Sequence, residues 1–155
     1  RYYQYRDLGS QLVTTGGSMG YAVPAAIAAK LVYPKKTVVS FNGDGCFMML
    51  GQEIINAVEN ELNPIFIIIN NKKLGTIRMH QERNFPKRII GTDILNPDFV
   101  ALANAYGVNA YRVTDTKEFR SIFEKAKNSH NATLIDLVIE ANVLGPALEI
   151  GKNIG

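Results

Sequence analysis

The chain has 155 residues, 46% of them hydrophobic and 20% charged, and its formal net charge is +3. This composition is typical of one globular domain and excludes a disordered or fibrous chain. No apolar run approaches the roughly 20 residues of a membrane-spanning helix, and the basic residues lack the dense stripe of a nucleic-acid-binding protein. The single cysteine excludes an internal disulfide and fits a reducing compartment. We therefore expect a cytoplasmic protein that binds neither a membrane nor nucleic acid.

The first half of the chain predicts alternating strands and helices. Residues 11–14 indicate a short strand, and the alanine-rich residues 21–33 indicate a helix that ends before a proline. Residues 37–41 and 64–69 are β-branched, apolar runs typical of buried strands. Apolar side chains recur at helical spacing over residues 54–62, so this part predicts one strand–helix–strand unit.

The second half continues the same alternation. Asn96 as N-cap and Pro97 as first helical residue predict a helix that ends at Gly107. The other predicted elements are strands over 109–113 and 133–139 and an amphipathic helix over 115–128. We therefore predict an α/β fold, a doubly wound parallel sheet with helices on both faces, in a single domain over residues 1–155.

Two stretches lack a periodic pattern. Residues 72–95 contain two glycines and a proline and predict a long loop, which in a compact domain is often functional. The tail over residues 142–155 is rich in glycine and predicts weak structure.

Two short polar motifs follow the two central predicted strands. They are Asn42-Gly43-Asp44-Gly45 and Asn70-Asn71. Ligands bind beyond the carboxyl ends of strands in open parallel sheets, so we expect Asp44 and Asn71 at one site. A charged and a neutral oxygen suit Mg²⁺, which takes few side-chain ligands and shares phosphate oxygens. The two glycines let the backbone approach a phosphate closely, so the motifs predict a magnesium ion holding a diphosphate.

Three alternatives remain. A Gly-Asp-Gly triplet alone favours a plain strand-to-helix turn with Asp44 as N-cap, but the following Ile-rich strand and Asn70-Asn71 favour the metal site. A nucleotide-dependent oxidoreductase is disfavoured because no Gly-x-Gly-x-x-Gly lies between a strand and a helix. A non-catalytic interaction module that keeps the fold would have no physical need for both Asp44 and Asn71.

These residues resemble a known family. The triplet at 43–45 followed by Asn70-Asn71 looks like the thiamine-diphosphate-binding motif of thiamine-dependent decarboxylases and carboligases. Residues 15–26, 74–78 and 96–107 are similar to the same family, and its acetolactate-synthase-like branch matches best. The resemblance covers about residues 9–142 and implies the thiamine-diphosphate-binding fold.

The resemblance implies roles for individual residues. Asp44 and Asn71 would bind Mg²⁺ through their side chains, and Lys73 through its carbonyl. Met19 would prop thiamine diphosphate in its bent shape, although from the residues alone it indicates only a core position at the start of a helix. Gly17 would approach the pyrimidine ring by its backbone. The implied cofactor-binding set is Gly17, Met19, Gly43, Gly45, Cys46, Leu74, Gly75 and Thr76.

Two residues depart from the family pattern. Cys46 stands where related sequences often carry serine, so a side-chain hydrogen bond would change while backbone contacts remain. His80 stands where acetolactate synthases usually carry tryptophan, which weakens a literal acetolactate synthase assignment. A histidine in this charged stretch is more often a solvated loop residue than a substrate contact.

The resemblance also implies partners. A glutamate that activates the cofactor is expected on a missing N-terminal domain, so we expect no catalytic residue in this chain. The chain opens without methionine, and we expect it to be the C-terminal cofactor domain of a longer, homo-oligomeric enzyme. That enzyme would decarboxylate or ligate a small 2-oxo acid, as a lyase or transferase, and this chain alone would be inactive.

Overall fold

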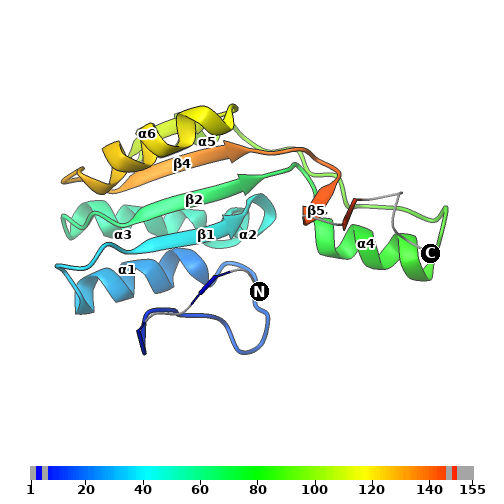
Figure 1. Cartoon of the computed structure of the whole chain (residues 1–155), viewed down its shortest axis with the longest axis horizontal. Coiled ribbons are helices and arrows are strands. Elements are labelled where there is room, and N and C mark those ends of the chain that lie inside the picture. The colour runs from blue at the N-terminus through cyan, green and yellow to red at the C-terminus, as the bar shows by residue number, and fades with distance from the viewer. Residues whose placement is uncertain (1–2, 5–6, 146–147, 150–155) are drawn as a thin grey trace.

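The fold is organised by a four-stranded parallel sheet. A computed structural model describes residues 3–4, 7–145 and 148–149. The strand order is β1-β2-β4-β3, and all three pairings are parallel. The strands are β1 (Val39–Gly43), β2 (Ile65–Asn70), β3 (Asn109–Val113) and β4 (Thr133–Val138). Their carboxyl ends all point to the same side of the molecule, as Figure 1 shows.

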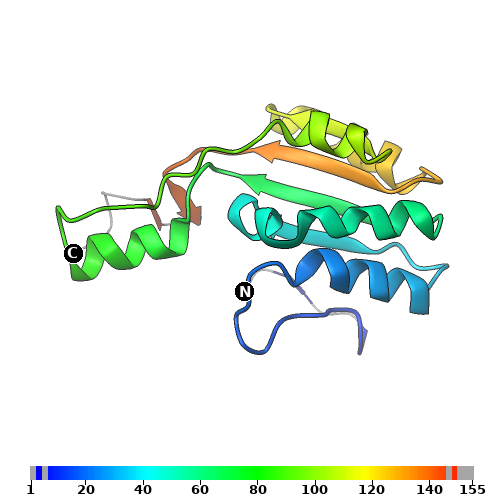
Figure 2. The same ribbon diagram turned by 180° about the vertical axis from the view of Figure 1, so that it is seen from behind.

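Helices cover both faces of the sheet, which confirms the predicted α/β fold class. One face carries four helices, and their side chains share one apolar cluster with β2 and β4. These helices are α1 (Ala22–Val32), α2 (Asp44–Leu50), α3 (Ile54–Glu59) and α5 (Phe99–Ala105), with a 3-10 turn at Gly51–Glu53 before α3. The opposite face carries α6 (Thr116–Lys127), and the two layers are seen from either side in Figures 1 and 2.

The amphipathic pattern of α6 explains its position. Phe119, Ile122 and Phe123 pack with buried Ala126 against the second apolar cluster of the sheet, as their spacing predicts. The rings of Phe119 and Phe123 stack with centroids 5.7 Å apart. Asp115 caps the helix by accepting a hydrogen bond from the Lys117 N–H at 2.9 Å.

Two predicted elements are wrong. Residues 11–14 form no strand, because β1 is the edge of the sheet and none of the described strands pairs with them. Leu12 and Val13 are exposed. Residues 72–95 are not one loop, because helix α4 (Gly75–Asn84) lies within them. No proline interrupts α4, and an ion pair one turn apart supports it, Arg78 with Glu82 at 2.6 Å.

The cap of α5 also differs from the prediction. The helix begins at Phe99, and Asp98 is its N-cap, accepting hydrogen bonds from the N–H groups of Val100 and Ala101. Asn96 does not cap the helix. Its side chain reaches the carboxyl end of the sheet instead.

Helix α4 and a short hairpin lie beyond the carboxyl ends of the strands (Figure 1). The hairpin pairs β5 (Val143–Gly145) with β6 (Leu148–Glu149). Residues 146–147 and 150–155 lie outside the described residues, so the weakly structured tail over 142–155 stays a prediction. In the part of the chain that the structure describes, no helix is long and apolar enough to cross a membrane.

Candidate diphosphate and metal site

Asp44 is the centre of the candidate site. It begins α2 directly after β1, and its side chain is only 1% exposed. Its Oδ1 accepts a hydrogen bond from the Gly45 N–H at 2.9 Å. Its Oδ2 accepts two, from the Lys72 N–H at 2.6 Å and from Asn96 Nδ2 at 2.7 Å. Three donors therefore hold a buried carboxylate that has no cationic partner among the ion pairs of the described residues.

The turn after β2 brings Asn71 to the same place. Lys72 has a positive φ of 56°, a left-handed conformation that is uncommon outside glycine, and its N–H binds Asp44. The Asn71 Oδ1 accepts a hydrogen bond from the Lys73 N–H at 3.1 Å. The Lys73 side chain forms an ion pair with Asp93, not with Asp44. A strained turn at this position is typical of a functional site.

Gly45 lies where four segments meet. A Cβ on this residue would be 2.7 Å from Leu74 Cδ2, 3.5 Å from Met19 Cε and 3.6 Å from Ile94 Cδ1. The glycine-rich segment that carries Met19, the turn after β1 and the start of α4 are therefore in contact. Met19 is 38% exposed and can still contact a ligand. Only glycine fits here without moving a neighbour, because the Leu74 side chain fills the space that a Cβ would take.

The residues at the start of α4 lie next to this contact. Leu74 occupies the N-cap position and no side chain caps the helix, so its first N–H groups have no side-chain acceptor. Gly75 and Thr76 form the first turn. Such a helix start favours an anion through its free N–H groups and its dipole.

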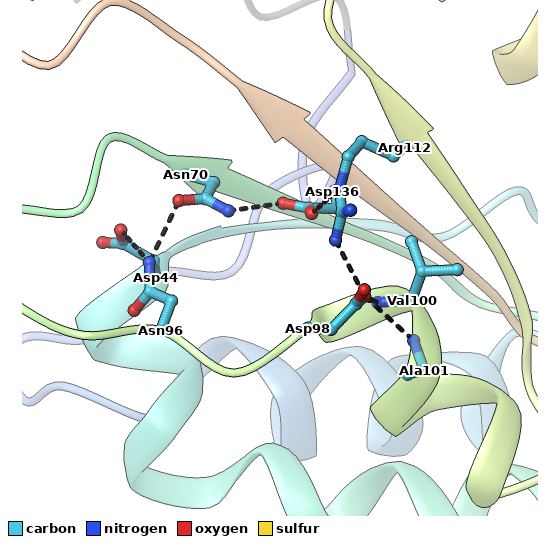
Figure 3. A network of polar contacts seen from close by, with 8 residues as sticks. All are labelled: Asp44, Asn70, Asn96, Asp98, Val100, Ala101, Arg112 and Asp136. Atoms are coloured by element: carbon cyan, nitrogen blue, oxygen red, sulfur yellow. Dashed lines mark hydrogen bonds and ion pairs between the residues drawn. The ribbon is translucent and has the colours of Figure 1, made fainter.

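A chain of polar side chains extends from Asp44 across the ends of three strands (Figure 3). Asn96 Nδ2 also donates to Asn70 Oδ1 at 3.0 Å, and Asn70 Nδ2 donates to Asp136 Oδ1 at 2.8 Å. Arg112 Nε donates to the other oxygen of Asp136 at 2.9 Å, and the same guanidinium donates to Asp98 at 2.8 Å. The pKa of Arg112 is raised, first by its hydrogen bond to Asp136 and then by that to Asp98.

These residues fit a magnesium ion. No group of three or more His, Cys, Asp or Glu side chains gathers anywhere in the described segments, so one carboxylate and neutral oxygens are what the chain offers. Asp44 Oδ1 and Asn71 Oδ1 each accept one hydrogen bond and each keep one acceptor position. The backbone hydrogen bonds between residues 72–74 and 92–94 use the Lys72 carbonyl and the Leu74 N–H, and they do not use the Lys73 carbonyl. A few hard oxygens completed by phosphate and water are the usual environment of Mg²⁺.

The structure brings together several of the predicted site residues. Met19, Asp44, Gly45 and Leu74 are in one cluster, and Asn71 is joined to it through Lys72. Cys46 is half-buried in α2, and its Sγ is 3.7 Å from the Cβ position of Gly43. His80 is exposed on α4 and makes no hydrogen bond recorded among the described residues.

Sequence reasoning missed four side chains of the polar chain. The sequence predicts Asn96 as a helix cap and Asn71, not Asn70, as the ligand. It gives Asp136 and Arg112 no role beyond their predicted strands. A signal for Asp136 was present, because a charged residue interrupts the apolar run of residues 134–138. A buried charge in such a strand requires a partner.

Comparison with known proteins gives a consistent result. The family model described as "Thiamine pyrophosphate enzyme, C-terminal TPP binding domain" matches residues 1–137. The acetolactate synthase large subunit of Cyanidium caldarium is 36% identical over 136 residues, covering 86% of this chain and 23% of that protein. The acetolactate synthase isozyme 2 large subunit of Escherichia coli K12 is 33% identical over 125 residues, covering 80% of this chain and 23% of that protein.

Two solved structures of decarboxylases are also similar to this chain. Benzoylformate decarboxylase from Polynucleobacter necessarius superposes with a TM-score of 0.75 at 25% identity, covering 83% of this chain and 25% of that one. The 4-hydroxybenzoylformate decarboxylase of Rhodococcus jostii RHA1 also gives 0.75, at 29% identity, covering 79% of this chain and 23% of that one. The chain thus spans about a quarter or less of the proteins it matches.

Proposed function

Because the chain belongs to the thiamine pyrophosphate enzymes, as their C-terminal cofactor-binding domain, we propose that it holds the diphosphate of thiamine diphosphate through Mg²⁺. The observation that carries the proposal is the environment of Asp44. Its buried carboxylate is oriented by three N–H donors and keeps one acceptor position on Oδ1, next to the turn that carries Asn71.

The proposed ligands are three oxygens of this chain. Asp44 would bind through Oδ1, Asn71 through its side-chain oxygen and Lys73 through its carbonyl. The diphosphate would lie against the backbone of the remaining residues, where the uncapped start of α4 presents N–H groups. These residues are Gly43, Gly45, Cys46, Leu74, Gly75 and Thr76.

Met19 and Gly17 would contact the organic part of the cofactor. Met19 is partly exposed and its Cε lies 3.5 Å from the Cβ position of Gly45, which suits an apolar support beneath a bent ligand. Gly17 has a positive φ of 67°, so its backbone turns in a way that few other residues allow. When bound, thiamine diphosphate supplies a carbon nucleophile for the carbonyl of a 2-oxo acid.

For the whole protein we propose a 2-oxo acid decarboxylase or carboligase that resembles acetolactate synthase. The relatives named acetolactate synthase support this branch. The group that activates the cofactor would come from another domain of the same enzyme, in a cytoplasmic homo-oligomer. The alternative is a non-catalytic module that retains the fold, and it predicts no binding of cofactor or metal at Asp44.

Calorimetric titration of the 155-residue chain with thiamine diphosphate, with and without Mg²⁺, tests the proposal. We expect binding only when Mg²⁺ is present. Asp44→Ala should abolish it because the only charged ligand is lost, whereas Asp115→Ala, which removes an exposed helix cap, should bind normally. Binding that is equal with and without Mg²⁺, or unchanged in Asp44→Ala, would refute the metal assignment. No binding, even in a longer polypeptide that carries this domain, would refute the cofactor assignment.

A further inference from the structure

The two oxygens of Asp44 have different environments. Oδ2 accepts hydrogen bonds from the Lys72 N–H and from Asn96 Nδ2, so both of its acceptor positions are used. Oδ1 accepts only the N–H of Gly45, its own neighbour in the chain. The carboxylate therefore presents one saturated oxygen and one oxygen with a position left.

The two donors on Oδ2 come from the two ends of one segment. Lys72 precedes α4, and Asn96 follows the loop after it. Two backbone hydrogen bonds also join these ends, from Leu74 N–H to Thr92 O at 2.8 Å and from Ile94 N–H to Lys72 O at 3.0 Å. We call residues 72–96 the α4 arm. Asp44 thus fastens the base of the arm to the end of β1.

The orientation of Asn96 is fixed from the far end of the polar chain. Arg112 and the Asp136 carboxylate require that Asn70 turn its NH₂ toward Asp136. The Asn70 oxygen then faces Asn96 and requires a donor, so the Asn96 NH₂ points to both Asn70 and Asp44. Because Asp136 is fully buried, this arrangement cannot reverse without leaving Oδ1 of a buried carboxylate without its donor and facing the Asn70 oxygen.

We propose that Asn96 is a positioning residue that occupies Asp44 Oδ2, ties the α4 arm to the metal site and leaves Oδ1 as the single oxygen for the cation. The part that concerns the cation rests on the proposed Mg²⁺ function, and the part that concerns the arm does not. Mg²⁺ requires near-octahedral geometry, whereas Ca²⁺ accepts a carboxylate through both oxygens. A blocked Oδ2 therefore favours Mg²⁺ over Ca²⁺.

The first measurement is amide hydrogen exchange of the full chain without metal. In Asn96→Ala the Leu74 and Ile94 amides should exchange about tenfold faster, because a hydrogen bond to a charged acceptor is lost. The Ile67 amide in the central strand should not change. Unchanged exchange at the arm, or equal acceleration at Ile67, would overturn the role of Asn96 in fastening the arm. If Asn96→Ala does not fold, Asn96→Ser is measured in its place.

The second measurement is the affinity for inorganic pyrophosphate in the presence of Mg²⁺ and of Ca²⁺. Asn96→Ala should reduce the preference for Mg²⁺ by about tenfold, since it opens Oδ2 to a second bond with Ca²⁺. Asn63→Ala is the matched control, because Asn63 is also half-buried and donates one hydrogen bond, to Ser129 O, but precedes β2 at the opposite end of the sheet. An unchanged preference in Asn96→Ala, or an equal change in Asn63→Ala, would overturn the effect on the cation.

The two measurements separate the possible failures. If neither the unsubstituted chain nor a longer polypeptide that carries this domain binds pyrophosphate with either cation, the proposed function fails and the cation part falls with it. The hydrogen exchange result then still decides whether Asn96 fastens the arm.

Discussion

Replacing Asp44 with asparagine tests whether the buried carboxylate stabilises the fold as well as binding a metal. Asparagine has the same shape but only one acceptor oxygen. If that oxygen takes the place of Oδ2, it can still accept from Lys72 and Asn96. The new NH₂ group then faces the Gly45 N–H, where the carboxylate accepted a hydrogen bond at 2.9 Å.

The expected loss follows from these three contacts. One hydrogen bond to a charged acceptor, worth about 1.5–3 kcal/mol, disappears, and two others become neutral and weaker. Removal of the buried charge offsets part of this loss because its desolvation cost disappears. We expect Asp44→Asn to lower the free energy of unfolding by about 2–3 kcal/mol without metal. For a chain of this size that is a fall in Tm of roughly 4–12 °C.

Thermal and urea unfolding of the metal-free chain measure the effect. Asp115→Asn is the control, since asparagine and aspartate cap helices about equally well, and its stability should change by less than about 0.5 kcal/mol. A Tm for Asp44→Asn equal to or above that of the unsubstituted chain would refute the reasoning. It would mean that the desolvation free energy of the buried carboxylate exceeds the stabilisation from its three hydrogen bonds.

Further substitutions and a titration test other contacts of the site. Gly45→Ala should change stability by less than about 1.5 kcal/mol in urea unfolding, because helix propensity offsets the contact with Leu74, yet calorimetry should show weaker diphosphate binding. Met19→Ala should bind thiamine diphosphate only a few-fold more weakly by calorimetry, while the turnover of an assembled enzyme should fall far more, because the proposed role of Met19 is to shape the cofactor. The pKa of Asp98 is lowered, first by the backbone N–H of Ala101 and then by Arg112. Stability from Asp98 is therefore present above its ordinary pKa and is lost as the pH falls through the lower folded value. Arg112→Met should raise the pKa of Asp98 toward its ordinary value in an NMR titration, and an unchanged value would contradict the contribution of Arg112.

Strong periodic patterns predicted the fold well. The strand at Asn109–Val113 has the predicted bounds, and the apolar face of α6 packs as its spacing indicates. The sequence does not predict helix α4 because it is mostly polar and buries no residue, so hydrophobic periodicity gives no signal. Residues 11–14 resemble a strand in composition, but a strand needs a pairing partner that sequence alone does not supply.

Local motifs in the sequence predict part of the candidate site, and the rest depends on tertiary contacts. Asp44 and Asn71 are identified by local motifs, since strand ends place them together. Asn96 was assigned to the nearest helix because Asn-Pro is a common helix start, whereas Asp98 two residues later takes that position. Which of two nearby capping residues is used depends on tertiary contacts, here the hydrogen bonds of Asn96 to Asp44 and Asn70.

The lack of buried residues in α4 has an evolutionary consequence. None of its ten residues contributes to the apolar clusters of the domain, and the arm is held at its base by backbone pairing and by Asp44. Substitutions on α4 therefore cost the fold little, whereas substitutions at the base disturb the site. Selection for a new substrate or a new contact can act on this helix with little conflict from stability, so we expect α4 to diverge faster than the sheet that supports it.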